Sequence, residues 1–249
     1  MRRSYYVLVG PLTILALWFA VTQFHLIDPI FLSPPIKTFN RLFNLLALGD
    51  ILPDVGWTVI RWLIGLVIGV LLGIPIGLLM GASKKIYGSL EVLVDFSRSI
   101  PVMTLFPLAL VLFGIGNQSK IALAAWASLI YVVINTIYGV RHVREARIRM
   151  ARSLRATRFQ IFMKIIIPDA LPEVFVGIRM SISMSLVIVV ASEMIMGTNT
   201  GLGKRIFDAG MLYQISDMYA AIIIAGILGY LSNKAFVAME NSVIHWSGK

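Results

Sequence analysis

Six long stretches of this chain are almost free of charge, and they limit its possible folds more than any other feature. A helix needs about 20 mostly apolar residues to cross the roughly 30 Å hydrocarbon core of a membrane. The gaps between charged residues place such helices at about residues 5–24, 62–83, 99–119, 121–140, 173–197 and 216–236. We therefore predict an all-α integral membrane protein with six transmembrane helices, forming a single domain over residues 1–249.

The composition agrees with this prediction. Apolar residues make up 58% of the chain and charged residues 14%, against roughly half and about a quarter in soluble domains. The mean hydropathy is +0.86, and a soluble domain must cover its surface with polar groups. These values argue against a soluble enzyme, a disordered chain and a nucleic-acid-binding domain. The chain has no cysteine, which excludes disulfides, thiolate metal sites and cysteine nucleophiles.

The basic residues are divided unevenly between the two predicted sides of the membrane. With the N-terminus inside, the inner segments hold 15 Lys and Arg, from Arg2 to Lys249, and the outer segments hold 6, namely Lys37, Arg41, Arg61, Lys120, Lys204 and Arg205. Because Lys and Arg collect in cytoplasmic loops, we expect both termini in the cytoplasm. The net charge of +10 is then mainly a topology signal, accompanied by attraction to lipid headgroups, and nucleic acid is not an expected partner. The first span is longer than the apolar core of a signal peptide, so we expect it to be retained.

The second predicted span carries a row of glycines at every fourth position. These are Gly65, Gly69, Gly73, Gly77 and Gly81. On a helix they share one face, and the missing side chains allow another helix to approach closely. Helix packing is the favoured interpretation, with a ligand-binding row as the alternative.

The loop between the fourth and fifth spans, residues 141–172, is long and basic. Between Arg141 and Lys164 it holds eight Lys or Arg, and Glu145 is its one acidic residue there. Apolar residues recur through the loop, which predicts two short helices that meet at residues 155–157. Helices that expose apolar side chains suit docking into a groove of a soluble partner. A connector lying on the membrane surface is the alternative, and composition does not separate the two.

Residues 149–158 and 165–172 resemble the EAA loop of the binding-protein-dependent ABC importer permeases. That motif consists of Glu-Ala-Ala, three residues, Gly, nine residues and Ile-x-Leu-Pro. Aligned on Pro168, its isoleucine and leucine fall on Ile165 and Ile167, its glycine on Arg155, and its Glu-Ala-Ala on Arg149-Met150-Ala151. The spacing, the proline and the last alanine match, whereas the glutamate and the glycine are replaced by arginine.

Two further segments support this resemblance. Gly73-Ile74-Pro75-Ile76-Gly77 is similar to the second-span signature of the nitrate/sulfonate/taurine branch, and Ser192-Glu193 with Gly201-Leu202-Gly203 is similar to the end of that branch's fifth span and its outer loop. The resemblance covers about residues 30 to 235 and implies the fold of a type I ABC importer permease.

The resemblance also implies partners. Permeases of this family form a channel from two subunits, often two identical copies, and an extracytoplasmic binding protein delivers the solute. Cytoplasmic ATPase subunits, which use ATP and Mg²⁺, hold a coupling helix in the EAA loop, so the chain itself is expected to bind no cofactor or metal. On this basis we expect the ATPase-coupling surface to comprise Arg149, Ala151, Arg152, Ser153, Leu154, Arg155, Ala156, Thr157 and Pro168. A glycine permits a tight turn through positive φ, so we expect Arg155 to change that turn or to pair with the partner.

Polar residues inside the predicted spans are the candidates for the translocation pathway, because charges in a membrane are costly and usually functional. They are Arg179, Ser181, Ser185, Ser192 and Glu193 in the fifth span and Asn135 in the fourth. Two interpretations stay open. In the first, the serines and the asparagine bond neighbouring helices, Arg179 reaches toward the membrane surface, and Glu193 caps a helix or pairs with a neighbour. In the second, the fifth span lines the pathway and contacts an anion.

We do not expect the chain to hydrolyse ATP. Residues 201–205 approach a phosphate-binding loop but lack its first glycine and its final Ser or Thr, so we interpret them as a turn. The histidines at positions 25, 142 and 245 lie on different loops and form no metal-binding motif. The prediction is a non-enzymatic permease subunit that imports a small solute of the nitrate, sulfonate or taurine kind. A passive channel and an integral-membrane enzyme without an ATPase partner are the alternatives, and co-purification of a separate ATPase would distinguish them.

Overall fold

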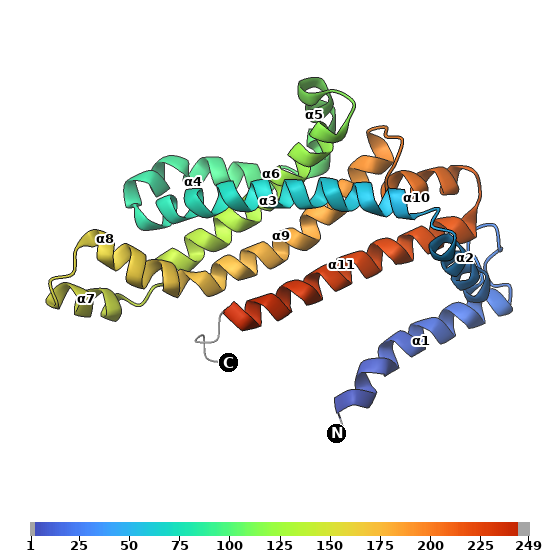
Figure 1. Ribbon diagram of the computed structural model, residues 1–249, viewed down its shortest axis with the longest axis horizontal. Coiled ribbons are helices and arrows are strands. Elements are labelled where there is room, and N and C mark those ends of the chain that lie inside the picture. Colours follow the sequence, from blue (N-terminus) through green and yellow to red (C-terminus); the bar gives the residue numbers. More distant parts are fainter. Residues whose placement is uncertain (1–2, 244–249) are drawn as a thin grey trace.

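The computed structural model describes residues 3–243, and that part of the chain is built from helices without strands (Figure 1). Arg2 and Lys249, which contribute to the predicted charge distribution, lie outside the described residues, as does His245. The elements, in chain order, are α1 Arg3–Gln23, α2 Pro35–Ala47, α3 Leu52–Ala82, α4 Lys84–Ser99, η1 Val102–Leu105, α5 Phe106–Phe113, α6 Asn117–Arg141, α7 Glu145–Ser153, α8 Arg158–Ile161, η2 Phe162–Ile166, α9 Ile167–Ile195, α10 Leu202–Met211 and α11 Ile215–Val243.

Within residues 3–243, four helices are long and apolar enough to cross a membrane. They are α3, α6, α11 and the continuous helix Arg158–Ile195 that contains α8, η2 and α9. Counting the bent pair of α4 and η1–α5 as one span gives up to five crossings. α1 has 21 residues, of which Leu8–Gln23 form a shorter apolar helix in the part whose side chains are described, and six crossings are compatible with the fold if α1 is counted as well.

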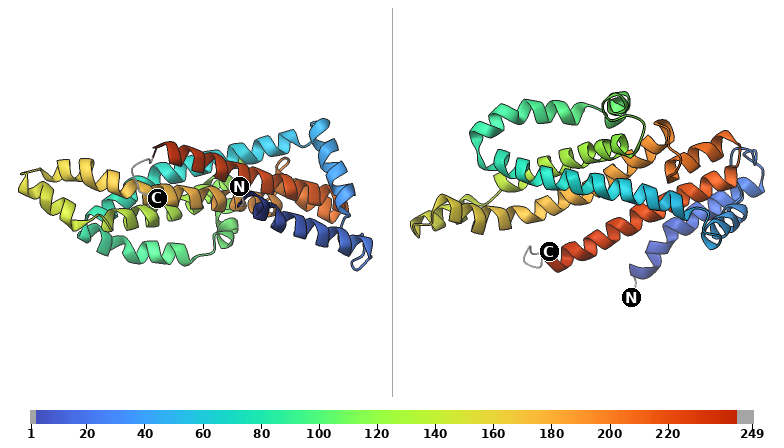
Figure 2. Two further views of the ribbon diagram at one scale, coloured as in Figure 1. Left: turned by 90° about the horizontal axis from the view of Figure 1, so that it is seen from below. Right: turned by 45° about the horizontal axis from the view of Figure 1, so that its top comes forward.

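The third predicted span, residues 99–119, is wrong in its position and shape. The chain turns back at Ser83 into α4, which runs alongside α6, and then bends by 92° into η1 and α5 (Figure 2). The charged residues of α4, among them Glu91, Asp95 and Arg98, interrupt its apolar character. Because the predicted spans were located from uncharged stretches, this helix was missed and Arg98 was placed in a loop.

Helices cover the other predicted spans, with shifted ends. α3 begins ten residues before the predicted start at 62, because Arg61 is enclosed by protein and does not end the helix. Arg61 is 2% exposed and Lys120 is fully buried. Both residues lie in helices, α3 and α6, and not in connecting segments, and their place on the outer side stays a prediction.

The glycine row of α3 lies against α6. A Cβ atom built on any glycine of the row would lie 2.5–2.9 Å from a Cβ atom of α6. The pairs are Gly65 with Ala124, Gly69 with Ser128, Gly73 with Val132, Gly77 with Thr136, and Gly81 with Val140. The residue numbers of α3 and α6 both rise by four from one pair to the next, so the two helices run parallel. Four residues are about one helical turn, so each turn of α3 contacts one turn of α6. The side chains missing from α3 thus allow α6 to pack directly on its backbone.

The short helix α2 packs at the end of the molecule where α10 lies (Figure 1). Its Leu45 is fully buried in a cluster with Ile51, Leu202 and residues of α11. The opposite face of α2, which includes Phe39 and Phe43, is exposed. α2 therefore has one face packed against the bundle and the opposite face exposed.

Candidate functional site

The basic segment between α6 and α9 folds as two short helices joined by a tight turn, as its apolar periodicity predicts. α7 ends at Ser153 and α8 begins at Arg158. At the end of α7, the backbone N–H of Ala156 donates to the Ala151 carbonyl at 3.0 Å, and the N–H of Arg155 donates to the Arg152 carbonyl at 2.9 Å. These two hydrogen bonds form a Schellman motif, which satisfies the free carbonyls at the end of a helix.

Arg155 occupies the position in this motif that favours glycine. Its φ is +57°, in the left-handed region that is unfavourable for residues with a Cβ atom. From the sequence, Arg155 is expected to change the turn or to pair with a partner. In the structure the turn is formed with arginine in the left-handed conformation. The turn therefore does not depend on a glycine at this position.

Thr157 starts the second helix. Its Oγ1 accepts a hydrogen bond from the Gln160 N–H at 3.2 Å, and the Gln160 side-chain oxygen accepts one from the Thr157 N–H at 2.8 Å. This reciprocal pair is a capping box. Thr157 thus fixes the direction in which α8 leaves the turn, a structural task that the prediction of a docking residue did not include.

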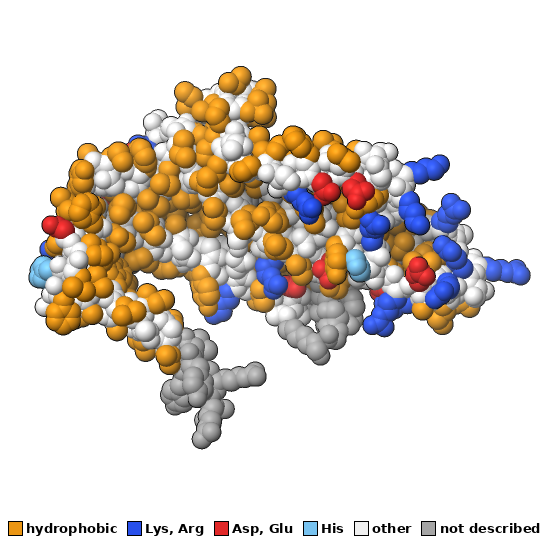
Figure 3. Space-filling view, turned by 180° about the vertical axis from the view of Figure 1, so that it is seen from behind, with side chains coloured by type: hydrophobic (Ala, Val, Ile, Leu, Met, Phe, Trp, Pro, Cys, Tyr) orange, Lys and Arg blue, Asp and Glu red, His pale blue; other side chains and the backbone are white. Residues whose placement is uncertain are grey.

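The tip of this segment presents apolar side chains among arginines. Met150, Leu154 and Phe159 are 69%, 75% and 68% exposed. Arg149, Arg152, Ser153 and Arg155 are exposed beside them, whereas Ala151 is buried and Ala156 is half-buried. Lys and Arg side chains gather at this end of the molecule, and the rest of the same face is mainly apolar (Figure 3).

Pro168, the last residue of the predicted coupling motif, lies in the first turn of α9. A proline lacks the backbone N–H that a helical residue donates, and its ring clashes with the carbonyl group four residues earlier. The chain accommodates it with the π-helical turn Phe162–Ile166, which ends with a hydrogen bond from the Ile167 N–H to the Phe162 carbonyl. Next to it, Asp169 forms an ion pair with Arg147 of α7, which ties the tip to α9.

The residues predicted for the pathway lie in different places. Ser181, Ser185 and Ser192 are fully buried, and each donates to a carbonyl of its own helix, at 2.8, 2.6 and 2.7 Å. Ser185 also accepts from the Trp62 indole N–H at 3.0 Å. Of these contacts, the one between Ser185 and Trp62 joins two helices, as the first interpretation expects, whereas those of Ser181 and Ser192 lie within α9.

Arg179 and Asn135 are closer to the protein surface. The Arg179 guanidinium lies 3.9 Å from the Glu240 carboxylate of α11, and its side chain is 45% exposed. The Asn135 amide donates to the Tyr131 carbonyl at 2.8 Å. Asn135 lines a cleft of about 560 Å³ between α6 and the bend after α4, and Arg179 is not part of that lining.

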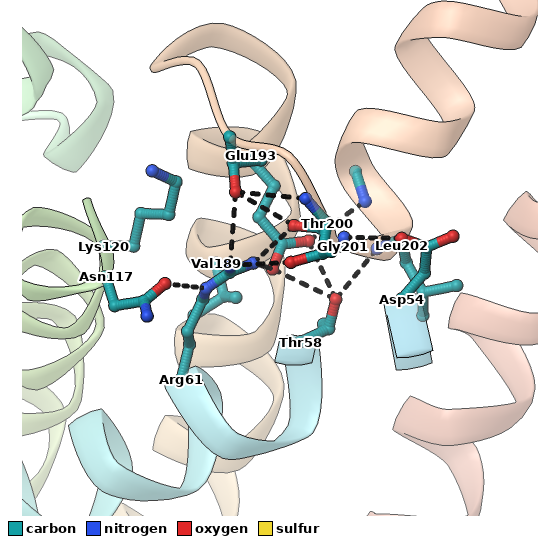
Figure 4. A network of polar contacts seen from close by, with 12 residues as sticks. Asp54, Thr58, Arg61, Asn117, Lys120, Val189, Glu193, Thr200, Gly201 and Leu202 are labelled. Carbon is teal, nitrogen blue, oxygen red and sulfur yellow. Dashed lines mark hydrogen bonds and ion pairs between the residues drawn. The ribbon is translucent and has the colours of Figure 1, made fainter. Parts of the chain in front are cut away.

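Glu193 forms a buried ion pair with Arg61 at the other end of the bundle (Figure 4). The Arg61 Nη1 and Glu193 Oε1 atoms are 2.6 Å apart, and the two side chains are 3% and 0% exposed. Arg61 also donates to the Thr200 carbonyl at 2.8 Å and to the Asn117 side chain at 2.8 Å. Pairing is one of the roles that the sequence suggests for Glu193, but the sequence does not identify Arg61, which lies 132 residues away.

The same carboxylate holds the loop before α10. Glu193 Oε2 accepts from the Gly203 N–H at 3.1 Å and from the Thr58 hydroxyl at 2.8 Å. A Cβ atom at Gly201 would lie 2.5 Å from the Glu193 carboxyl carbon, and one at Gly203 would lie 2.0 Å from the Val190 carbonyl oxygen. Both glycines are required for this close approach. Residues 202–205, interpreted above as part of a turn, instead begin helix α10.

The comparisons with known proteins agree with this architecture. Residues 69–241, more than half of the chain, match the family model described as the inner membrane component of binding-protein-dependent transport systems. The chain belongs to this family. It is the membrane-spanning permease subunit of an ABC importer, and ATP is hydrolysed by a separate partner subunit. The permease assignment decides against the passive channel and the integral-membrane enzyme.

Among its relatives, the permease is 31% identical to the taurine transport system permease protein TauC of Escherichia coli, over 97% of this chain and 90% of that protein. It is 30% identical to the putative aliphatic sulfonates transport permease protein SsuC of Bacillus subtilis, over 96% of this chain and 86% of that protein. A solved structure of the MetNI methionine ABC transporter in an inward-facing conformation has a TM-score of 0.69 at 22% identity, covering 79% of the permease and 97% of the matched chain. The last similarity supports the fold alone.

Proposed function

We propose that two identical copies of this permease form the pathway by which a small organic sulfonate, such as taurine or an aliphatic sulfonate, enters the cell. The 30–31% identity to permeases named for taurine and aliphatic sulfonates supports the substrate class. The solute is delivered by an extracytoplasmic binding protein at the α2–α10 end. The termini and the α7–α8 segment face the cytoplasm, because the arginines of that segment follow the positive-inside rule.

The α7–α8 segment is the element that docks on the ATPase. The observation that carries this proposal is the exposed apolar group of Met150, Leu154 and Phe159, held on a turn with defined caps at both sides. Aromatic residues, Met and Arg are enriched at the centres of protein interfaces. A rigid helix pair can also transmit motion between ATPase and permease, since coupling requires an element whose contacts with the partner differ between two states.

The docking proposal is tested by substitution at Leu154. We expect Leu154→Asp to abolish co-purification of the cognate ATPase, because it places a carboxylate in the centre of the apolar contact. Leu154→Met keeps an apolar side chain of similar volume and should retain the ATPase. Equal recovery of the ATPase with both variants, at equal permease levels, would contradict docking through this surface.

A further inference from the structure

The bend between α4 and η1 lies beside a cleft that is lined by the charged residue Arg98. Arg98 is the second-last residue of the 16-residue helix α4. With the α3–α4 turn taken as the membrane surface, a rise of 1.5 Å per residue places Arg98 about 20 Å along the helix, inside a hydrocarbon core of roughly 30 Å. A charge at such a depth is a functional-site candidate, and the predicted span boundaries had placed Arg98 in a loop.

Arg98 lines two neighbouring clefts. One, of about 460 Å³, lies between α4 and the end of α6 that leads to α7. The other, of about 560 Å³, is deeper in the bundle and includes the backbone break at Ile100 and Pro101. Ile134 is also shared by both linings. Irregular backbone at membrane depth is tolerated where it is buried in protein or lines a water-filled cavity, and broken helices mark binding sites in transporters.

The deeper cleft has the side chains that a small organic anion requires. Within the described part of the chain, Arg98 is the single charged residue of its lining. Ser97, Tyr131 and Asn135 add hydroxyl and amide groups, and the remaining wall includes Trp126, Ile130 and Met180. A planar guanidinium recognises oxyanions through paired hydrogen bonds, while the apolar wall suits a short alkyl chain.

Arg98 is able to exchange its present partner for a ligand. Its Nε atom lies 3.2 Å from Asp95 Oδ1, and the two side chains are 57% and 54% exposed. Exposed ion pairs of this kind contribute little. In contrast, the buried pair of Arg61 and Glu193 is enclosed on all sides. Arg98 therefore lines the cleft, and its ion pair with Asp95 is exposed and weak.

From these observations we propose that the deeper cleft is an anion-binding station of the translocation pathway, with Arg98 binding the sulfonate or carboxylate head of the solute. The proposal rests on the proposed function for the substrate class and adds the residues that contact the solute. Of the pathway residues expected from sequence, Asn135 belongs to this station. Arg179, which lies beside Glu240 on α11, does not.

Charge-selective labelling tests the station without depending on transport. The chain has no cysteine, so Ile134→Cys introduces a single thiol between the two clefts. In membrane vesicles containing the complex, its rates of reaction with 2-sulfonatoethyl methanethiosulfonate and with the trimethylammonium analogue are compared. We expect Arg98→Gln to lower the ratio of anionic to cationic rates roughly tenfold, from Coulomb energies at about 6 Å in water. Arg98→Lys should preserve most of the ratio, and the matched control Arg179→Gln should leave it unchanged.

An unchanged ratio in Arg98→Gln would overturn the proposal, as would an equal change in Arg179→Gln. The cationic reagent also reports folding, because its rate should not fall in a correctly folded Arg98→Gln variant. In the reconstituted importer, the same variant should raise the KM for taurine at least tenfold while ATPase co-purification is retained. Failure of the wild-type complex to import either taurine or an alkanesulfonate would refute the proposed substrate class, whereas the labelling ratio would still decide the role of Arg98.

Discussion

The two ends of this permease are stabilised in different ways. At the α10 end, charged groups from distant parts of the chain meet in the interior, as with Arg61 and Glu193. At the α7–α8 end, the stabilising contacts are local backbone caps and the ion pair of Arg147 with Asp169, and apolar side chains remain exposed. A buried network fixes the tertiary structure, and its polar groups are all enclosed, so a partner protein cannot contact them. A tip that is held by local caps keeps its shape, while its apolar side chains remain exposed to a partner. The difference separates a structural anchor from an element presented for binding.

Removal of one partner of the buried pair should have the largest effect. Glu193→Ala leaves the Arg61 charge buried without its partner and should lower the free energy of unfolding by about 3–5 kcal/mol. Thermal unfolding of the purified permease in detergent measures this. Ser192→Ala is the matched control, because the Ser192 hydroxyl bonds only within its own helix, to Val189 at 2.7 Å. Equal melting temperatures for the two variants would show that the ion pair does not anchor this end.

The close contact of α3 and α6 gives the next largest effect. In Gly69→Ala the new Cβ atom would lie 2.6 Å from the Ala125 carbonyl oxygen and 2.5 Å from the Ser128 Cβ. Overpacking of this kind costs about 1–3 kcal/mol. Gly226→Ala on α11 meets no atom within 4 Å and should be neutral or stabilising by up to about 1 kcal/mol. If the melting temperature falls equally for both, the glycine row has no special packing role.

Loss of the capping box should act only on the tip. Thr157→Ala removes the N-cap of α8 and should cost about 1 kcal/mol. Faster amide hydrogen exchange across residues 158–161, with an unchanged melting temperature, is the expected result. Ser153→Ala removes a hydroxyl that bonds back to the Arg149 carbonyl and should not alter this exchange. A fall in the global melting temperature with Thr157→Ala would contradict the local character of this end.

Relief of the left-handed arginine should give the smallest effect, and in the stabilising direction. Arg155→Gly removes a backbone penalty of about 1–2 kcal/mol, partly offset by about 0.4–1 kcal/mol of additional freedom in the unfolded chain. Exchange at the Arg155 and Ala156 amides, which donate the Schellman hydrogen bonds, should therefore slow about threefold. Arg155→Ala keeps the Cβ atom and should show no such gain. An equal slowing in Arg155→Ala would point to reduced charge repulsion instead.

The sequence allowed the local features to be predicted and not the long-range ones. The helices of the basic loop follow from the recurrence of apolar residues, and the glycine row follows from one helical period. The partner of Glu193 is 132 residues away, and no periodic pattern connects it to Arg61. The helix α4 was missed because charges such as Glu91 and Arg98 interrupt it, and a count of uncharged gaps cannot distinguish a loop from a helix that lines a polar cleft.

The central claim is that the α7–α8 tip is the cytoplasmic element held by the ATPase. Single-cysteine cross-linking in the cysteine-free chain tests it most directly, with Leu154→Cys at the tip and Leu212→Cys, also exposed, at the α10 end. We predict that the thiol at position 154 is unreactive to an impermeant maleimide in intact cells and cross-links to the ATPase in inverted vesicles, while the thiol at position 212 reacts from outside and forms no such cross-link. Labelling of position 154 from outside, or its failure to cross-link in a complex that retains the ATPase, would contradict the claim.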